Sequence, residues 1–366
     1  MAGSIFGNIF KISTWGESHG KGIGVVIDGC PAGLELNETD IQICLNRRRP
    51  GQSPFATPRK ETDAVEILSG VFEGKTTGTP ISLIVFNQDQ RSHDYSQIAS
   101  YYRPGHADYS YDSKYGFRDY KGSGRASGRE TTARVAGGAI AKKILATLGV
   151  TVTAYTYSIG PVTIDMNHFD INEISNNFLC MPDSTSVQAA ETYLNRLKEE
   201  GNSSGGIIDC IVKNIPAGIG EPVFEKLDAN LAKAVMSIGS VKGIEIGDGF
   251  KVAERTGIEN NDAYYCEGEK TLKKTNHAGG ILGGISDGSD IFIRAAIKPT
   301  PSIGMTQQTA NKSFENIEIN IEGRHDPIIV PRAVVVVEAM VALTVVDMVL
   351  MNMSSKMDNV IKVYNQ

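Results

Sequence analysis

The sequence predicts an α+β fold built from two related halves within one domain, residues 1–366. The main observation is an internal repeat, because residues 22–33 read GIGVVIDGCPAG and residues 206–218 read GIIDCIVKNIPAG. Each copy is a β-branched strand pattern that ends in Pro-Ala-Gly, and a helical pattern follows it, at 38–45 and at 222–235. Copies about half a chain apart indicate two similar units rather than a linear solenoid. Chance similarity of two short strands is the alternative.

Further strands and helices complete this α+β pattern. Strands are predicted where β-branched residues lie between Gly or Pro residues, at 64–72, 80–86, 241–246, 290–297 and 314–321. Helices are predicted at 128–148, 186–200 and 331–351. The longest apolar stretch, 328–351, contains Pro331, Arg332, Glu338 and Asp347. These residues predict a buried helix rather than a membrane span.

The helix at 128–148 has the clearest end signals. Ser127 at the N-cap, followed three residues later by Glu130, forms the pattern of a capping box. Gly149 follows Leu148, the last apolar residue, where a helix usually ends. The helix is therefore predicted to begin directly after a Gly-rich segment.

Composition and charge narrow the classes of function. The apolar fraction is 41% and the charged fraction 21%, so the chain can bury a sizeable core. Glycine makes up 39 of 366 residues, about 11% against about 7% on average, which predicts shaped loops that lie close to a ligand. The net charge of −6 argues against a nucleic-acid binder and against a membrane-surface protein.

The cysteines and the N-terminus indicate a reducing compartment. The five cysteines are widely spaced and form no C-x-x-C motif, which predicts neither a disulfide framework nor a metal site. The first twenty residues lack the layout of a signal peptide. We therefore expect a cytoplasmic protein.

An anion site is predicted where the Gly-rich segment meets the capped helix. Residues 122–129 read GSGRASGR. A helix N-terminus offers free N–H groups to an anion, and Arg125, Arg129 and Arg134 add positive charge. The segment is neither a Walker A loop nor a dinucleotide fingerprint. A solvated surface is the alternative reading of these arginines.

The long connection 88–124 carries seven tyrosines, many charges and little periodicity. A connection of this length is usually functional or disordered, and its aromatic content argues against disorder. We expect an ordered active-site loop.

Three residues in short polar loops are candidates for proton transfer. His19 and His106 lie in Gly-containing loops with charged neighbours, and a bound anion beside either ring would raise its pKa. Asp326 lies beside an Arg and a His and before a Pro. An ordinary loop histidine and a structural ion pair are the alternatives. The rigid turn 298–302, KPTPS, offers one cation and two hydroxyls to an anion.

The sequence resembles the chorismate synthase family. Three signatures carry the resemblance: GESHG running on to VIDGCP within 16–31, GRASGRET at 124–131, and RHDP through EAM within 324–340. RRRPG, RPGHAD, NHAGGILGG and KPT stand between them in the family order. The match covers about residues 6–351.

The resemblance implies a fold and a reaction. The family fold is a sandwich of antiparallel sheets with helices, built from two related halves and usually assembled as a homotetramer. The reaction is an anti-1,4-elimination of phosphate from 5-enolpyruvylshikimate 3-phosphate, which gives chorismate. It requires reduced FMN without net redox change, and NADPH is a candidate indirect reductant. Family members differ in having their own reductase activity.

The resemblance also implies roles for individual residues. His19 would protonate the leaving phosphate, His106 would protonate reduced flavin, and Asp326 would help the flavin act as a base, with Ser18 and Ser127 nearby. The implied flavin-binding residues are Arg125, Ala126, Ser127, Gly239, Ser240, Gly283, Lys298, Pro299, Thr300, Pro301, Ser302 and Arg324. The implied substrate-binding residues are Arg48, Arg49, Arg129 and Arg134.

The sequence departs from the family pattern at a few positions and leaves two other functions open. Pro54 stands where many members have a basic residue, which puts one substrate contact in doubt. A binding protein that has lost catalysis is one alternative, and a phosphotransferase is the other. The retained His19, His106 and Asp326 argue against the first. The missing Walker A motif argues against the second.

Overall fold

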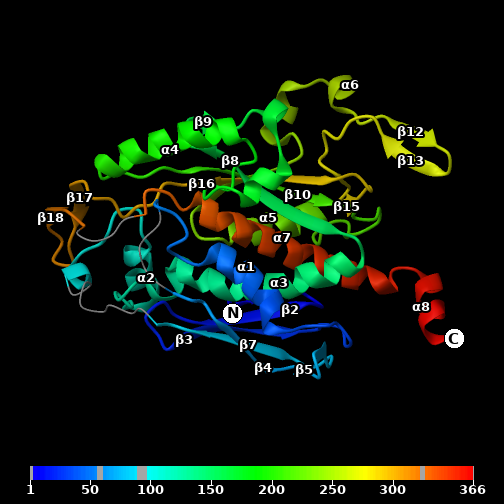
Figure 1. Cartoon of the computed structure of the whole chain (residues 1–366), viewed down its shortest axis with the longest axis horizontal. Coiled ribbons are helices and arrows are strands. Elements are labelled where there is room, and N and C mark those ends of the chain that lie inside the picture. The colour runs from blue at the N-terminus through cyan, green and yellow to red at the C-terminus, as the bar shows by residue number, and fades with distance from the viewer. Residues whose placement is uncertain (1–2, 56–60, 89–96, 322–325, 366) are drawn as a thin grey trace.

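Two antiparallel five-stranded sheets enclose a layer of helices (Figure 1). The computed structural model describes residues 3–55, 61–88, 97–321 and 326–365. The first sheet has the order β1 (Ile5–Phe6), β2 (Lys11–Gly16), β3 (Gly22–Asp28), β7 (Ile81–Phe86), β4 (Val65–Ser69). The second has the order β11 (Val241–Ile246), β16 (Ile291–Ile297), β10 (Gly206–Lys213), β8 (Thr151–Ile159), β9 (Val162–Thr163).

Four helices lie between the sheets, and they are α1 (Glu38–Arg48), α3 (Thr131–Thr147), α5 (Leu227–Met236) and α7 (Val330–Met351). The remaining helices are α2 (Asp108–Tyr115), α4 (Ser184–Glu199), α6 (Gly257–Asn260) and α8 (Met357–Tyr364). This arrangement confirms the predicted α+β sandwich of antiparallel sheets with helices.

The two sheets repeat one topology. The strand order β2-β3-β7-β4 in the first sheet corresponds to β8-β10-β16-β11 in the second. In each half, one long helix, α3 or α7, ends the unit and lies against the other. The repeat read from residues 22–33 and 206–218 falls on β3 and β10, which occupy equivalent central places. The predicted duplication is therefore confirmed, and chance similarity is excluded as its explanation.

The Pro-Ala-Gly turns are held by the same hydrogen bonds in both halves. The Thr76 hydroxyl donates to the carbonyl of Pro31 over 2.6 Å and accepts from the Leu34 N–H over 3.0 Å. The Ser286 hydroxyl likewise donates to Pro216 over 2.6 Å and accepts from Ile219 over 2.9 Å. A hydroxyl at this place satisfies one backbone donor and one backbone acceptor at once.

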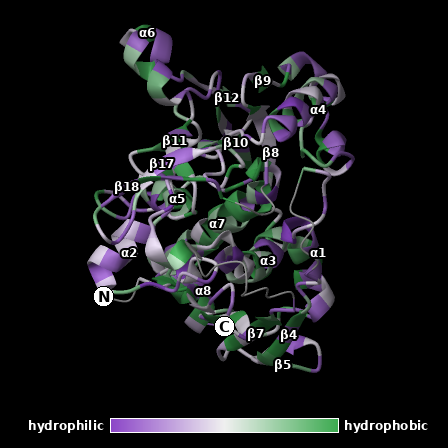
Figure 2. Cartoon of the chain, turned by 90° about the vertical axis from the view of Figure 1, so that its left-hand side faces the viewer, coloured by the Kyte–Doolittle hydropathy of each residue, from purple (hydrophilic) through white to green (hydrophobic). Residues whose placement is uncertain are grey.

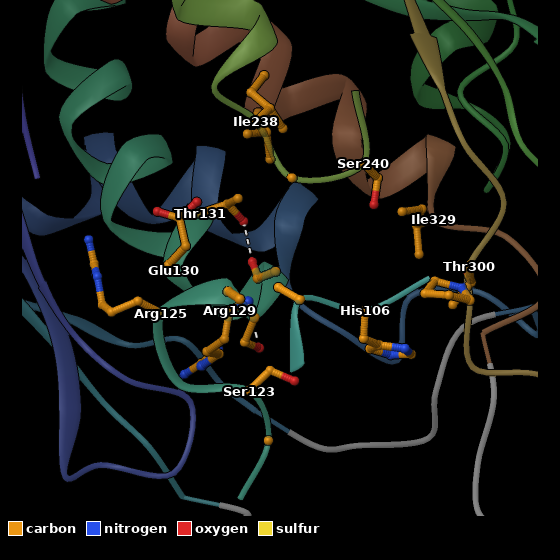
Figure 3. A pocket seen from close by; sticks show the side chains of 18 of the residues that line it. His106, Ser123, Arg125, Arg129, Glu130, Thr131, Ile238, Ser240, Thr300 and Ile329 are labelled. Carbon is orange, nitrogen blue, oxygen red and sulfur yellow. Dashed lines mark hydrogen bonds between the residues drawn. The ribbon is translucent and has the colours of Figure 1, made fainter. Parts of the chain in front are cut away.

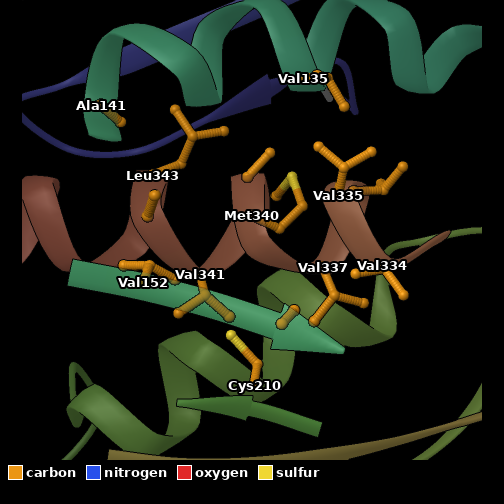
Figure 4. Packing of buried hydrophobic residues seen from close by; sticks show 14 of the residues in the cluster. Val135, Ala141, Val152, Cys210, Val334, Val335, Val337, Met340, Val341 and Leu343 are labelled. Carbon is orange, nitrogen blue, oxygen red and sulfur yellow. The ribbon is translucent and has the colours of Figure 1, made fainter. Parts of the chain in front are cut away.

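The core is built around α7. This helix is rich in valine, which loses side-chain freedom in a helix at up to about 0.7 kcal/mol per residue. Full burial of a valine contributes about 1.5–3 kcal/mol, so packing outweighs propensity. Figure 4 shows Val337 and Val341 directed toward the strand side that carries Val152 and Cys210, and Leu343 directed toward α3.

The position of α7 in the core also answers the question of a membrane span. The helix is long and apolar enough to cross a membrane, yet 83% of its most apolar 18-residue window is buried in the protein. In Figure 2, hydrophobic colour gathers on α7, and α2 and α4 are largely hydrophilic. The prediction of a buried helix is confirmed.

Helices α3 and α7 approach each other closely at one glycine. A Cβ atom on Gly138 would lie 2.4 Å from the Cβ of Ala339 and 2.7 Å from its Cα. Only a residue without a side chain allows this backbone separation. The contact joins the last helix of the first half to the last helix of the second.

Several predicted elements differ in detail. The strand predicted at 64–72 is broken at Gly70, whose φ is +82°, into β4 and β5 (Val71–Phe72), which pairs with β6 (Lys75–Thr76). The strand predicted at 314–321 is shorter, β18 (Asn316–Ile319), and pairs with β17 (Gln307–Ala310). Other elements were not predicted from the sequence: β2, β8, α8 and the hairpins β12–β13 (Tyr264–Glu267, Lys270–Lys273) and β14–β15 (Ile281–Leu282, Ile285–Ser286).

The predicted loop 88–124 is partly helical. Residues 97–100 form a short 3-10 turn and α2 spans Asp108–Tyr115, whereas 89–96 lie outside the described residues. Gly116 ends α2 in the left-handed conformation, with φ +79°. The described part of the segment is therefore ordered, as predicted, although the helix α2 within it was not foreseen.

The capping box predicted before α3 is only half present. The Ser127 hydroxyl accepts from the Arg129 N–H over 3.3 Å, as an N-cap does. The Glu130 side chain instead pairs with Arg134, at 2.9 Å. The first turn is a 3-10 segment, Gly128–Glu130, and the α-helix begins at Thr131.

Candidate active site

A cavity of about 990 Å³ lies where the two halves meet (Figure 3). The first half contributes the segment that runs from Gly105 through α2 to the start of α3, and also Arg48 at the end of α1. The second half contributes the turn after α5, the turn after β16, and the first residues of α7. The volume is at the upper end of the roughly 300–1,000 Å³ usual for small-molecule sites.

Positive charge dominates the described lining of this cavity. The basic lining residues are Arg48, Arg118, Arg125, Arg129, Arg134, Lys298 and Arg332. The acidic ones are Asp108, Asp119, Glu130 and Asp326. The N-terminal ends of α3 and α7, which carry free N–H groups, also border the cavity. The arrangement suits a small molecule with several negative charges.

His106 lines the cavity and is held at both ring nitrogens. Nδ1 lies 3.1 Å from the carbonyl oxygen of Pro104, which can only accept, so Nδ1 carries a proton. The hydroxyl of Ser302 therefore donates to Nε2, over 3.0 Å. Burial and then the nearby Arg103 guanidinium lower the pKa of His106 to about 4, so the free protein holds a neutral ring.

Ser18 and His19 lie behind the cavity wall at Gly122. The Ser18 hydroxyl donates to the Gly122 carbonyl over 2.9 Å, and its oxygen therefore accepts from Nδ1 of His19 over 3.0 Å. Gly122 lines the cavity, whereas Ser18 and His19 do not. A Cβ on Gly122 would lie 2.0 Å from Nδ1 of His19, so the two are in direct contact.

Asp326 lines the cavity from the segment before α7. Its Oδ2 lies 3.2 Å from Nη1 of Arg332, and the side chain is largely buried. Arg332 also donates from Nε to the carbonyl of Arg48, over 3.3 Å. The neighbouring Arg324, predicted to contact flavin, lies outside the described residues.

Four of the other five predicted arginines differ in how they are held. Arg48 and Arg129 share the buried carboxylate of Asp63. Arg134 lies across the cavity wall and donates to the Ser237 hydroxyl over 2.6 Å. Arg125 lines the cavity, and its guanidinium donates to the hydroxyl of Thr14 on β2 over 2.7 Å.

The remaining predicted positions divide into those at the cavity and those away from it. Ala126, Ser127, Gly239, Ser240, Lys298, Thr300 and Pro301 line it. Pro299 and Ser302 do not, although Ser302 reaches His106. Arg49 caps the end of α1, and Gly283 lies in the turn of the β14–β15 hairpin, both outside the lining. Pro54 also lies outside it, and its carbonyl accepts from Lys198 over 3.3 Å.

Several residues of the cavity lining were not predicted as site residues. Tyr111 and Tyr115 lie one turn apart on α2, with ring centroids 5.5 Å apart. The four-residue spacing within the Tyr-rich stretch was a signal for this helix. Arg118 lines the cavity beside them, and its side chain is fixed by Asp112. No pattern in the sequence shows that a residue after α2 turns back toward α3.

Four buried donors of lining residues make no hydrogen bond to any described residue. They are Nε of Arg48, Nε of Arg118, Nη2 of Arg129 and the hydroxyl of Thr300. A buried polar group without a partner is costly, and native proteins rarely keep one. Two of them lie near a carboxylate without a hydrogen bond: Nη2 of Arg129 is 3.7 Å from Glu61, and Nε of Arg118 is 3.6 Å from Asp108.

Comparisons with known proteins agree along nearly the whole chain. A family model described as chorismate synthase matches residues 10–350. A chorismate synthase of Agathobacter rectalis is 65% identical over 366 residues and covers 100% of both chains. One of Methanosarcina barkeri is 54% identical and covers 95% of this chain and 96% of its own.

A solved structure supports the same relationship. A crystal structure of chorismate synthase matches with a TM-score of 0.76 and 32% sequence identity. The match covers 98% of this chain and 97% of that one. Similarity in sequence and in fold therefore extends over both halves and the cavity between them.

Proposed function

Because this chain belongs to the chorismate synthase family, we propose that its cavity binds 5-enolpyruvylshikimate 3-phosphate beside reduced FMN. The chain is a carbon–oxygen lyase of the shikimate pathway. Its reaction eliminates phosphate from this substrate to give chorismate, without net redox change. One observation carries the proposal: a single cavity of about 990 Å³ gathers the basic residues together with His106 and Asp326.

The lining fits a flavin mononucleotide. Ile238, Ile329 and Val336 offer apolar surface to a ring system. Lys298 and the unpaired hydroxyl of Thr300 offer a cation and a donor to a phosphate. When bound, reduced flavin supplies electron density that helps the phosphate leave the substrate. Ala126, Ser127, Gly239 and Ser240 are further lining positions that would hold it.

The arginines would bind the anionic groups of the substrate. The substrate carries two carboxylates and a phosphate, and guanidinium groups match both in geometry. Arg48, Arg129 and Arg134 are buried or largely buried and fixed by hydrogen bonds before any ligand arrives. Fixed donors stabilise charge that develops on a departing phosphate without reorganising.

The proton-transfer groups would act from different sides of the cavity. His106 has a neutral ring with a lone pair at Nε2, so it takes up a proton there once an anion raises its pKa. Asp326 offers a carboxylate beside Arg332 as a proton acceptor. His19 would give a proton to the leaving phosphate and would need access past Gly122. These roles, and that of Ser18 in orienting His19, are part of the proposal.

We also propose a cytoplasmic homotetramer and a single domain over residues 1–366. Residues from both sheets and all four central helices belong to one core cluster, which supports the single domain. NADPH is proposed only as an indirect reductant. Oxidation of NADPH by the purified protein with FMN, followed at 340 nm, would show that it has its own reductase activity.

One assay tests the activity and its alternatives. The purified protein is supplied without air with 5-enolpyruvylshikimate 3-phosphate and dithionite-reduced FMN, and chorismate and phosphate are measured. We expect equal amounts of both products, and none when FMN is omitted. A folded protein that binds substrate but forms no product would be a binding protein. Phosphate transfer from ATP would indicate a phosphotransferase.

A further inference from the structure

Two basic residues of the cavity share one buried carboxylate. Oδ2 of Asp63 lies 2.6 Å from Nη2 of Arg48, and Oδ1 accepts a hydrogen bond from Nη1 of Arg129. Arg48 comes from the end of α1 and Arg129 from the turn before α3. A single carboxylate therefore sets the separation of two guanidinium groups that belong to different elements.

Asp63 is fully buried and has an unusual backbone conformation. Its side chain is 0% exposed, and its backbone has φ +48°, a conformation that few residues other than glycine adopt. The side chain of Glu61 is also 0% exposed, and its Oε2 lies 3.7 Å from Nη2 of Arg129, with which it forms an ion pair. Asp63 itself does not line the cavity. It can act on a ligand only through the two arginines.

Arg48 and Arg129 are buried, and both residues line the cavity. Nε of Arg48 and Nη2 of Arg129 are buried without a hydrogen bond to any residue in the described part of the chain. The side chains are only 2% and 5% exposed, yet both residues line the cavity. Each guanidinium is thus fixed by Asp63 and belongs to a residue that lines the cavity.

We infer that Asp63 is a positioning residue, which holds Arg48 and Arg129 at the spacing that binds the anionic groups of the substrate. The inference rests on the proposed function. Arg48 and Asp63 are both charged at neutral pH. Burial lowers the pKa of Arg48 only to about 10, and the two neighbouring guanidinium groups hold the pKa of Asp63 below its ordinary value. A negative charge near an anion site would by itself repel the ligand. Positioning and repulsion therefore predict opposite effects when that charge is removed.

The deciding variant is Asp63→Asn, which keeps the size of the side chain and removes its charge. We expect the Kd for 5-enolpyruvylshikimate 3-phosphate, measured by calorimetry on flavin-free protein, to rise by roughly tenfold or more, because both arginines lose their common anchor. KM should rise by a similar factor with reduced FMN. An unchanged or lower Kd would overturn the inference.

Asp209→Asn is the matched control. Asp209 is also a buried carboxylate, and it holds Arg294 by two hydrogen bonds of 2.7 and 2.8 Å away from the cavity. We expect this variant to lower thermal stability and leave the Kd within about twofold of the wild type. Equal losses of affinity in both variants would mean that Asp63 is only structural.

Asp63→Glu decides the question if Asp63→Asn does not fold. This variant keeps the charge and moves the carboxylate by one methylene, so positioning predicts weakened binding and a purely electrostatic role predicts wild-type binding. A separate result would contradict the proposed function itself: the wild-type protein would form no chorismate. If the wild type is active, the affinities of the Asp63 variants test the positioning role alone.

Discussion

At the scale of single residues, the hydrogen bonds of His106 determine what it can do. The Pro104 carbonyl fixes the proton on Nδ1, and Ser302 donates to Nε2. When Nε2 takes a proton, the Ser302 hydroxyl has to turn and accept instead. A hydroxyl can reverse in this way, whereas a carbonyl at the same place would hold the proton permanently. Ser302 thus keeps both protonation states of His106 satisfied.

The lowered pKa of His106 predicts how the stability of the free protein depends on pH. The folded value is about 4, against 6.5 for the ordinary side chain, so the unfolded chain binds more protons between these pH values. The wild type should therefore lose up to roughly 3 kcal/mol of stability relative to His106→Asn as pH falls from 6.5 to 4. Denaturant unfolding of both proteins at several pH values measures this difference. A constant difference across the window would contradict the neutral ring.

Replacement of His106 tests its part in the reaction. We expect His106→Ala to lower kcat by about 10²–10⁴-fold, or roughly 3–5 kcal/mol of barrier, because the variant lacks the proposed proton-transfer group. Anaerobic turnover with reduced FMN measures the loss. His168→Ala is the control, because His168 has a side chain that is 57% exposed and lies away from the cavity. If both variants turn over like the wild type, His106 is an ordinary loop histidine.

At the scale of elements, the contact of α3 with α7 depends on Gly138. We expect Gly138→Ala to lower the free energy of unfolding by about 1–3 kcal/mol, although alanine favours helices, because its Cβ would meet the backbone of Ala339 at 2.7 Å. Urea unfolding measures the change. Gly257→Ala in α6 is the control, since nothing lies within 4 Å of its added Cβ. Its effect should stay within about 0.5 kcal/mol.

Elements with a local signal could be predicted from the sequence, and elements fixed by distant contacts could not. The strands at 80–86 and 241–246 and the helices at 186–200 and 331–351 were predicted nearly to their ends. The partner of Glu130 was not, because Arg134 competes with the backbone N–H for its carboxylate. The break at Gly70 follows from pairing with the neighbouring strands, which the chain alone does not display.

The same distinction holds for the candidate site. Residue types that bind anions or transfer protons pointed to the Gly-rich turn, His106 and the 298–302 segment. The structure places most of these residues at one cavity. Asp63 was missed because a carboxylate that binds two arginines leaves no local pattern. The position of Gly283 outside the cavity lining could not be foreseen either, since it depends on how a hairpin is oriented.

At the scale of the whole molecule, the duplication explains where the site lies. Each half ends in a long helix, and the N-terminal ends of α3 and α7 both border the cavity. Joining two similar units therefore brings two anion-binding helix ends to one place. The proposed substrate and the proposed flavin each carry a phosphate, so a site with two such ends suits the pair.

The shared helix layer predicts that the two halves unfold together. The inner faces of both sheets are covered by the same packed helices, so the loss of one sheet would expose the apolar surface of α3 and α7 that the other half needs.

The single tryptophan, Trp15 on β2, reports on the first half through its fluorescence. Hydrogen exchange of peptides from β10, read by mass spectrometry, reports on the second. We expect both probes to give the same urea midpoint. Repeating the measurement at a tenfold lower protein concentration separates subunit dissociation from unfolding. Two midpoints that stay apart at both concentrations would mean that each half is a domain with its own core.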